Sequence, residues 1–417
     1  MKNKIFYGNI LYSKAPNEVK EYKNHYLVFN GTKVSGIYAS KPAIEGEFFD
    51  YEGKIIIPTF VDLHLHAPQF PLAGFQMDLE LLEWLNSYVF PEESKYKNVE
   101  YAKKHYNRFV EELKKSTSGY FSIFGTIHTD SDLYLMQLLE DSNLVSYVGK
   151  VNMNRNSPEY LIEGTEESIN ETKRFIDLAK NFKNTKPIIT PRFIPSCTDD
   201  LMQWLGDYAK DNNLPIQSHL DENPNEIAWV KELVPSAKSY TEAYKKFNNL
   251  NDKTIMAHCV WMDDEEINMI KESNAFIAHC PTSNNNLSSG IAPIRKYLNL
   301  GLNVGLGSDV AGGHTLDMFE IMNNVITMSK MYWRYVDKSM QPLSFKEAFY
   351  LATLGGGGYF GKVGKLEEDY DASIVVLDDS HLESNYNLPT LIERVERMSY
   401  EKDYKMISKF VKGERVL

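Results

Sequence analysis

Apolar segments recur through the middle of the chain, and their lengths and boundaries predict buried strands. Eight such segments can be distinguished, at residues 55–66, 119–128, 144–153, 187–194, 214–220, 253–259, 275–281 and 303–309. Segments with helical periodicity separate most of them, as at 100–116, 166–182 and 263–273. This alternation predicts an α/β fold built as a closed, parallel (β/α)8 TIM-type barrel, with a doubly wound open sheet as the structural alternative.

The two ends of the chain have a different texture. Residues 1–57 alternate apolar and polar positions, are rich in aromatic residues and contain the turn sequence NGTK, which together favour short strands. The segments 371–379 and 405–417 share this texture. Because neither end is long enough to bury a good core alone, we expect residues 1–57 and 365–417 to form one small β-sandwich domain. Residues 58–364 would then form the barrel.

Composition narrows the class of partner. The chain has 417 residues and a formal net charge of −12. That charge argues against a surface that follows phosphates, so we expect neither nucleic acid nor an anionic membrane as a partner. Cys197, Cys259 and Cys280 form no C-x-x-C pair, which indicates neither a disulfide framework nor a thiolate zinc site. The first residues lack the apolar core of a signal peptide, and a cytoplasmic location is expected.

Polar residues fall at the carboxyl ends of the predicted strands. His64 and His66 are two positions apart, so both imidazoles project from one face of their strand. The other such residues are His128, His219, His258, His279 and Asp309. In a (β/α)8 barrel these strand ends converge on one mouth. His128 or His279 alone could be an ordinary buried histidine, but the set predicts one zinc ion held by His64, His66, His219 and Asp309.

A carboxylate lies close to one of these predicted ligands. Glu222 follows His219 by three residues in the sequence SHLDENPNE. Zinc acidifies a bound water to a pKa near ~7, and the resulting hydroxide needs a proton carrier beside it. Glu222 is the candidate carrier. The alternative is an acid at the start of the helix expected at 226–233, exposed to solvent.

Several motifs along the chain carry a family resemblance. They are HLHAPQFPLAGFQMDLELLEWLNSYVFPEE (64–93), IHTD (127–130), PRFIPSC (191–197), SHLDEN (218–223), AHCVWMDDEE (257–266), IAHCPTSN (277–284), GLGSDVAGG (305–313) and LATLGG (351–356). With these motifs the chain resembles the guanine deaminase branch of the amidohydrolase superfamily. HAPQ and LLEWL are specific to the branch, whereas HxH, the later histidines and the late aspartate are shared more widely.

The resemblance implies a homodimer with one zinc ion per subunit that hydrolyses guanine to xanthine and ammonia. By position, it implies the zinc ligands His64, His66, His219 and Asp309. It also implies that Asp309 helps to take a proton from the zinc-bound water. Glu222 would pass a proton to the purine ring, and His258 would bind the water or the leaving amine and hold the developing charge.

For the substrate, the resemblance implies that Gln69 and Arg192 bond the purine edge and that Phe193 packs near the ring. An Arg donor facing O6 would favour guanine over adenine, whose amino group is a donor. Alternatively, Arg192 could form a structural ion pair and Gln69 could face solvent. The segment 81–90 predicts an amphipathic helix that shapes the pocket or a dimer surface. Asp221, Asn154 and His314 receive no firm role.

Other functions remain as alternatives. A related enzyme could deaminate or hydrolyse another aminated heterocycle, such as a pterin, a triazine or a modified adenosine. A catalytically inactive scaffold is a further alternative, although such relatives normally lose ligands or the acid. The zinc deaminase design with H-x-E and P-C-x-x-C is excluded, because the chain has no such cysteine pair.

Overall fold

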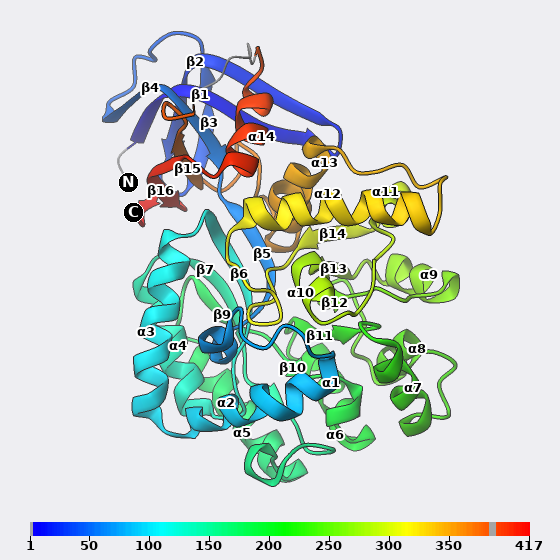
Figure 1. Cartoon of the computed structure of the whole chain (residues 1–417). Coiled ribbons are helices and arrows are strands. Elements are labelled where there is room, and N and C mark those ends of the chain that lie inside the picture. Colours follow the sequence, from blue (N-terminus) through cyan, green and yellow to red (C-terminus); the bar gives the residue numbers. More distant parts are fainter. Residues whose placement is uncertain (1–2, 383–388) are drawn as a thin grey trace.

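A computed structural model describes residues 3–382 and 389–417 of the chain. Residues 1–2 and 383–388, which belong to the predicted small domain, lie outside the described residues. Figure 1 shows a β-sheet domain that carries both termini, at the top of the view, above a larger part in which helices surround parallel strands. None of the helices in the described segments combines the length and apolar character needed to cross a bilayer.

The larger part is a closed barrel, which confirms the predicted (β/α)8 fold. Two four-stranded parallel sheets, β5-β6-β7-β9 and β11-β12-β13-β14, form its halves. One junction is a bridge between Ile189 and Ile216, and at the other Asp309 N donates to His64 O over 2.8 Å. The strands are β5 (Phe60–His66), β6 (Ser118–Phe124), β7 (Val145–Gly149), β8 (Val151–Asn152), β9 (Thr185–Pro187), β10 (Thr190–Pro191), β11 (Ile216–Leu220), β12 (Thr254–His258), β13 (Phe276–His279) and β14 (Asn303–Leu306).

Helices cover the barrel because each buries an apolar stripe against the strands. In α3 (Val99–Lys115) this stripe is Ala102, Tyr106, Phe109 and Leu113, and the Asn98 side chain caps the first turn. The predicted helices at 100–116, 166–182 and 263–273 are confirmed as α3, α5 and α9. The α-helices that follow α3 in the chain are α4 (Thr129–Asp141), α5 (Thr165–Ala179), α6 (Asp199–Asp211), α7 (Pro224–Leu233), α8 (Tyr240–Lys246), α9 (Asp264–Ser273), α10 (Pro281–Asn286), α11 (Ile294–Asn299), α12 (Met318–Tyr335), α13 (Phe345–Tyr350) and α14 (Leu391–Glu401).

The segment 55–66 is two strands, so the prediction of a single strand is wrong. β4 (Gly46–Pro58) belongs to the small domain, and β5 begins at Phe60. The backbone changes partners between them, because Thr59 N donates to Ser373 O whereas Phe60 N donates to Thr117 O. The apolar run is continuous because both strands are buried, and hydrophobicity alone does not indicate which sheet a strand joins.

Both chain ends form one β-domain, as expected. Its seven strands make a single sheet in the order β17-β16-β15-β4-β1-β2-β3. The sheet curls, so that Val34 N on β3 donates to Tyr370 O just before β15 over 2.9 Å. Its two halves thus face each other across a core that includes Phe6, Phe29 and Phe410. The remaining strands are β1 (Asn3–Ala15), β2 (Glu18–Asn30), β3 (Lys33–Tyr38), β15 (Ile374–Asp378), β16 (Lys405–Val411) and β17 (Glu414–Arg415).

A buried lysine joins the β-domain to the barrel. Lys409 on β16 is fully buried, and its Nζ donates to the carbonyl oxygens of Leu113, Ser116 and Ser118 over 2.8, 2.8 and 2.9 Å. Three acceptors match the three donors of an ammonium group. The contact fixes β16 against the end of α3 and the start of β6. The domain boundaries drawn from the sequence stay a prediction.

Candidate active site

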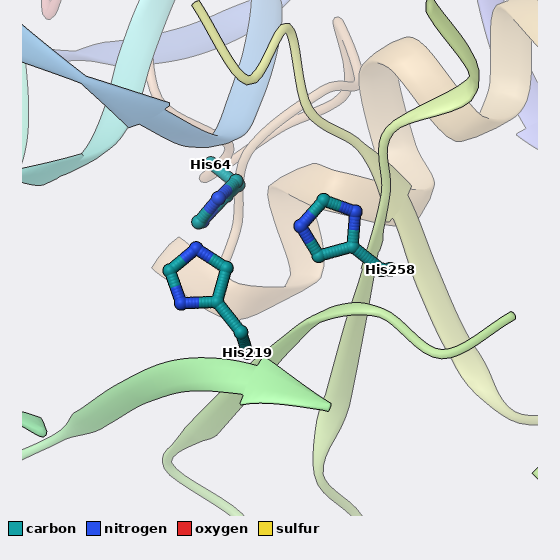
Figure 2. Close-up of side chains that lie close together, drawn as sticks. All are labelled: His64, His219 and His258. Carbon is teal, nitrogen blue, oxygen red and sulfur yellow. The ribbon is translucent and has the colours of Figure 1, made fainter. Parts of the chain in front are cut away.

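The four predicted metal ligands come together at the mouth of the barrel. His64 Nε2 lies 3.1 Å and His66 Nε2 3.4 Å from Asp309 Oδ1, and His66 Nε2 lies 3.2 Å from His219 Nε2. His64, His66 and Asp309 are buried, and His219 is partly buried. Figure 2 shows the imidazoles of His64 and His219 directed toward each other, with the His258 ring beside them. Elements far apart in the sequence supply these residues. His64 and His66 lie on β5, His219 on β11 and His258 on β12, and Asp309 lies in the loop after β14.

This donor set fits a small divalent cation. Four donor atoms about 2.0–2.1 Å from one ion lie about 3.3 Å apart in a tetrahedron, close to the three distances observed. His64 Nε2 has no hydrogen-bond partner among the described residues, although Asp309 Oδ1 is near. His219 Nδ1 donates to Arg192 O over 2.6 Å, which leaves the lone pair on Nε2 directed at the same point. Nitrogen and oxygen donors of this kind suit zinc.

Two further combinations of possible donors overlap with this set. The donor atoms of His64, His219 and His258 lie within 4.8 Å of one another, as do those of His64, Cys280 and Asp309. Cys280 is fully buried, and burial raises the pKa of its thiol well above its usual value. Three donor pairs in the set of three imidazoles and Asp309 lie 3.1–3.4 Å apart, so this geometry favours that set over one that includes Cys280.

The charges of the site have defined causes. Burial acts to raise the pKa of Asp309, but the neighbouring imidazoles, His64 first, hold it well below its usual value. Asp309 is therefore a carboxylate with oxygens available to a cation. Asp309, His258 and Asp221 have φ of 47°, 71° and 50°. Non-glycine residues in the left-handed region are strained, and such strain is concentrated at functional sites.

Glu222 is buried beside the predicted ligands, so the solvated alternative is wrong. Its side chain is directed inward because the αL backbone of Asp221 turns the chain directly after β11. Ser289 Oγ donates to Glu222 Oε1 over 2.9 Å, and Glu222 Oε2 lies 3.3 Å from His258 Nε2. Burial is the main cause that raises the pKa of Glu222, to about 7. A carboxyl group with such a pKa can accept and release a proton near neutral pH.

An asparagine fixes the orientation of His258. Asn284 Oδ1 accepts from His258 Nδ1 over 2.9 Å, which places the other ring nitrogen, Nε2, toward Glu222 and Asp309. Burial acts to lower the pKa of His258, but the negative charges of Glu222 and Asp309 raise it overall. His258 can therefore donate a hydrogen bond from Nε2 into the site.

A cavity opens at this point. Gln69, Arg192 and Phe193, the predicted substrate contacts, all line it, together with Glu222 and His258. Gln69 is buried, so the alternative of a solvent-facing residue is wrong. The remaining lining residues are His66, Leu81, Trp84, Leu85, His219, Glu226, Leu287, Asp309 and Gly312. Polar groups on one side and apolar side chains on the other suit a flat heterocycle.

The helical segment after residue 80 supplies the apolar wall. It comprises α1 (Leu81–Trp84), a π-helical turn η2 (Leu85–Val89) and α2 (Phe90–Ser94). Leu81, Trp84 and Leu85 reach the cavity, and the indole Nε1 of Trp84 donates to Phe75 O over 3.3 Å. The geometry therefore favours the predicted role of this segment in shaping the pocket over its alternative role in a dimer surface.

Some residues singled out in the sequence lie elsewhere. His128 does not reach the mouth, because β6 ends at Phe124 and His128 caps α4, where it lines another hollow with Lys97 and Glu163. His279 is buried at the end of β13, and burial together with nearby His258 lowers its pKa to about 3. Neither lines the cavity.

Three further residues have local structural contacts. Asn154 binds Thr165 and Thr198 through its side-chain amide. His314 is partly exposed, and its Nε2 lies 3.0 Å from Glu320 Oε1. Asp221 is buried rather than exposed, and burial raises its pKa well above its usual value, with Glu266 as the next cause.

Sequence reasoning missed the residues that hold the site residues in place. Glu93 binds both Gln69 and Arg192, Asn284 binds His258, and Ser289 binds Glu222. Glu226 accepts from the backbone N of Glu222 over 3.3 Å and lines the cavity. Glu93 ends the motif at 64–93 and Asn284 ends IAHCPTSN, so their place in these motifs was the available signal.

Comparison with known proteins identifies a matching family model and similar sequences. A family model described as the amidohydrolase family matches residues 55–416. The guanine deaminase of Dictyostelium discoideum is 39% identical over 379 residues, which cover 88% of this chain and 83% of that protein. The guanine deaminase of Mus musculus is 42% identical over 353 residues, which cover 82% of this chain and 77% of that protein.

A solved structure is also similar. The guanine deaminase from C. acetobutylicum, with bound guanine in the active site, has a TM-score of 0.96 and 43% identity, with all of both chains covered. A triazine hydrolase at 16% identity and a TM-score of 0.86 shares the fold. The chain belongs to the amidohydrolase family, in the branch formed by the guanine deaminases.

Proposed function

We propose that this protein hydrolyses guanine to xanthine and ammonia with the help of one zinc ion per subunit. The observation that carries the proposal is a single cavity in which the predicted metal ligands, the buried carboxyl of Glu222 and the purine-edge candidates Gln69 and Arg192 meet. The relatives with 39% and 42% identity, both named guanine deaminase, support guanine as the substrate.

The cation would be held by His64, His66, His219 and Asp309. When bound, a divalent metal such as zinc makes a water molecule acidic enough to provide hydroxide at neutral pH. The chain orients its own donors for this purpose, since His219 is fixed by its bond to Arg192 O and Asp309 by its place after β14.

Proton transfer then falls to residues around the cavity. Asp309 Oδ2 lies 3.8 Å from His258 Nε2, and the carboxylate accepts a proton as the attacking water loses it. Glu222 passes a proton to the ring nitrogen beside the reacting carbon, which its burial and raised pKa allow. His258, held by Asn284, donates a hydrogen bond to the oxygen or nitrogen that gains charge at that carbon.

Recognition of the purine ring is assigned to Arg192 and Gln69. Arg192 provides donors for O6 of guanine, and Gln69 offers a donor and an acceptor to the purine edge. Phe193 and Trp84, which both line the cavity, supply apolar surface for the ring. A 6-amino group facing Arg192 would leave two donors opposed, which disfavours adenine.

The test is ammonia release from a panel of purines, pterins and triazines by the purified, zinc-loaded protein. We expect guanine to have the highest kcat/KM, with xanthine as the product. Faster turnover of another ring, with little activity on guanine, would overturn the proposed substrate in favour of a related heterocycle deaminase. A protein that takes up no divalent metal and turns over no ring would instead be a scaffold.

The proposal extends to a homodimer that acts in purine catabolism in the cytoplasm, as the family resemblance implied. Its assembly is tested by analytical ultracentrifugation, in which a species of twice the 48.0 kDa chain mass is expected. A monomer at micromolar concentration would contradict the dimer without affecting the proposed chemistry.

A further inference from the structure

Glu93 occupies a buried position behind the purine-binding wall, between two residues of the cavity. We propose that Glu93 is a positioning residue that sets the selectivity for guanine by fixing both Arg192 and Gln69. The inference rests on the proposed function and deepens it. Glu93 is not among the residues that line the cavity, so it acts through its two partners.

The contacts are short and fully buried. Arg192 Nη1 donates to Glu93 Oε2 over 2.6 Å, and Gln69 Nε2 donates to Glu93 Oε1 over 2.9 Å. The side chains of Arg192 and Glu93 are 3% and 2% exposed, so water does not compete for this pair. A charge-assisted hydrogen bond shielded from water is stronger and more directional than one at the surface.

Helix α2 holds the guanidinium from two sides. Phe90 and Glu93 are three positions apart and share one face of the helix. The guanidinium of Arg192 lies 5.1 Å from the centre of the Phe90 ring, while Glu93 binds its Nη1. The stacking and the ion pair together restrict the Arg192 side chain, so its remaining N–H groups are directed before substrate arrives.

Glu93 also decides which way the Gln69 amide faces. An ionised carboxylate only accepts hydrogen bonds, so the NH2 group of Gln69 must face Glu93. The amide oxygen then lies on the other side, where the backbone N of Ala311 is 3.4 Å away. One N–H and part of the oxygen of Gln69 remain for the ring. A reversed amide would present the opposite donor and acceptor order.

The charge of Glu93 matters as well as its shape. Arg192 lies next to the predicted metal ligands, since its backbone oxygen accepts from His219 Nδ1. Glu93 neutralises the guanidinium, so a neutral base meets a directed donor rather than an unpaired buried cation. Glu93→Gln retains the size of the side chain but removes this charge, and its own NH2 group allows Gln69 to take either orientation.

The experiment compares guanine with 2-aminopurine, which carries the reacting amine but lacks O6. For Glu93→Gln we expect the KM for guanine to rise roughly 10- to 100-fold with kcat within about threefold of the original value. Activity on 2-aminopurine should fall less, because this ring loses only the contact with Gln69 and has no O6 for Arg192, so the ratio of the two kcat/KM values should fall at least tenfold. Zinc content and thermal midpoint identify variants that are merely misfolded.

Glu92 offers a matched control on the same helix. It is also buried, but it binds Lys95 and Tyr101, neither of which lines the cavity. Glu92→Gln should leave the selectivity ratio unchanged. If Glu93→Gln does not give folded protein, Glu93→Asp provides the same comparison, because a carboxylate one methylene shorter cannot reach both partners.

Two results would overturn the proposal. One is an unchanged ratio of guanine to 2-aminopurine activity in the folded Glu93 variants, whether or not both rates fall together. The other is an equal loss of selectivity in Glu92→Gln. A wild-type protein inactive on guanine would refute the proposed function itself, a different outcome that is recognised before any variant is made.

Discussion

His258 Nε2 lies 3.3 Å from Glu222 Oε2, so the candidate hydrogen-bond donor of the site is in direct contact with the candidate proton carrier. Each has a second contact that orients it, His258 with Asn284 and Glu222 with Ser289. Neither His258 nor Glu222 is one of the four predicted metal ligands. Each can therefore be substituted separately without removing a predicted metal donor.

Glu222→Gln removes the proton carrier while it retains the size of the side chain and a possible bond to Ser289. We predict that kcat falls roughly 10²- to 10⁴-fold, because this is the usual contribution of a positioned general acid or base. Zinc content and guanine binding should be preserved, which equilibrium dialysis measures. A kcat close to that of the wild type would assign proton transfer to another group.

The pH dependence of kcat/KM should report the same group. Glu222 must be protonated to act as a donor, and burial raises its pKa to about 7, so the donor form is lost as the pH rises through that value. A bound cation favours the carboxylate and shifts this loss to lower pH. We therefore predict that kcat/KM falls tenfold per pH unit once the pH passes this shifted pKa, which lies at or below about 7, and that the profile of Glu222→Gln is flat. A wild-type rate that rises from pH 7 to 9 would show that Glu222 accepts a proton instead.

Arg192→Ala should weaken guanine binding and selectivity. The KM for guanine is predicted to rise roughly 10- to 100-fold, because a directed donor to O6 is lost. The bond from His219 Nδ1 uses the backbone oxygen of Arg192, so zinc content should not change. Steady-state kinetics with metal analysis checks both expectations. An unchanged KM would mean that Arg192 does not contact the ring.

Lys409 gives a prediction about stability rather than catalysis. Lys409→Ala deprives the carbonyls of Leu113, Ser116 and Ser118 of a buried donor, which should lower the free energy of unfolding by about 3 kcal/mol. Urea denaturation followed by circular dichroism measures the change. Lys405, exposed on the same strand, is the control, and Lys405→Ala should have an effect below about 0.5 kcal/mol. Equal effects of the two substitutions would refute the structural role of Lys409.

The convergence of the four predicted ligands could be expected from the sequence, because each lies at or just after the end of a buried apolar strand and a closed barrel brings strand ends to one mouth. The same reasoning gave a wrong position for His128, because β6 ends at Phe124 and His128 lies beyond the strand, directly before α4. The break of 55–66 into β4 and β5 was also hidden, because both strands are buried and hydrophobicity does not identify the neighbouring strand.

The supporting residues could not be predicted from spacing. Ser289 binds Glu222 across 67 positions of sequence, and Glu93 binds Arg192 across 99. Such contacts depend on how loops pack after the barrel has closed, and no local periodicity encodes them. Gln69 and Arg192 themselves entered through the family resemblance, because neither lies in a pattern that distinguishes a ligand contact from an ordinary loop residue.

Anomalous diffraction at the zinc absorption edge, from crystals of the zinc-loaded protein, tests the central claim most directly. We predict one peak at the barrel mouth, about 2.0–2.2 Å from Nε2 of His64, His66 and His219 and from a carboxylate oxygen of Asp309. Absence of a peak there, or a peak held by Cys280 and Asp309 away from His66 and His219, would contradict the account.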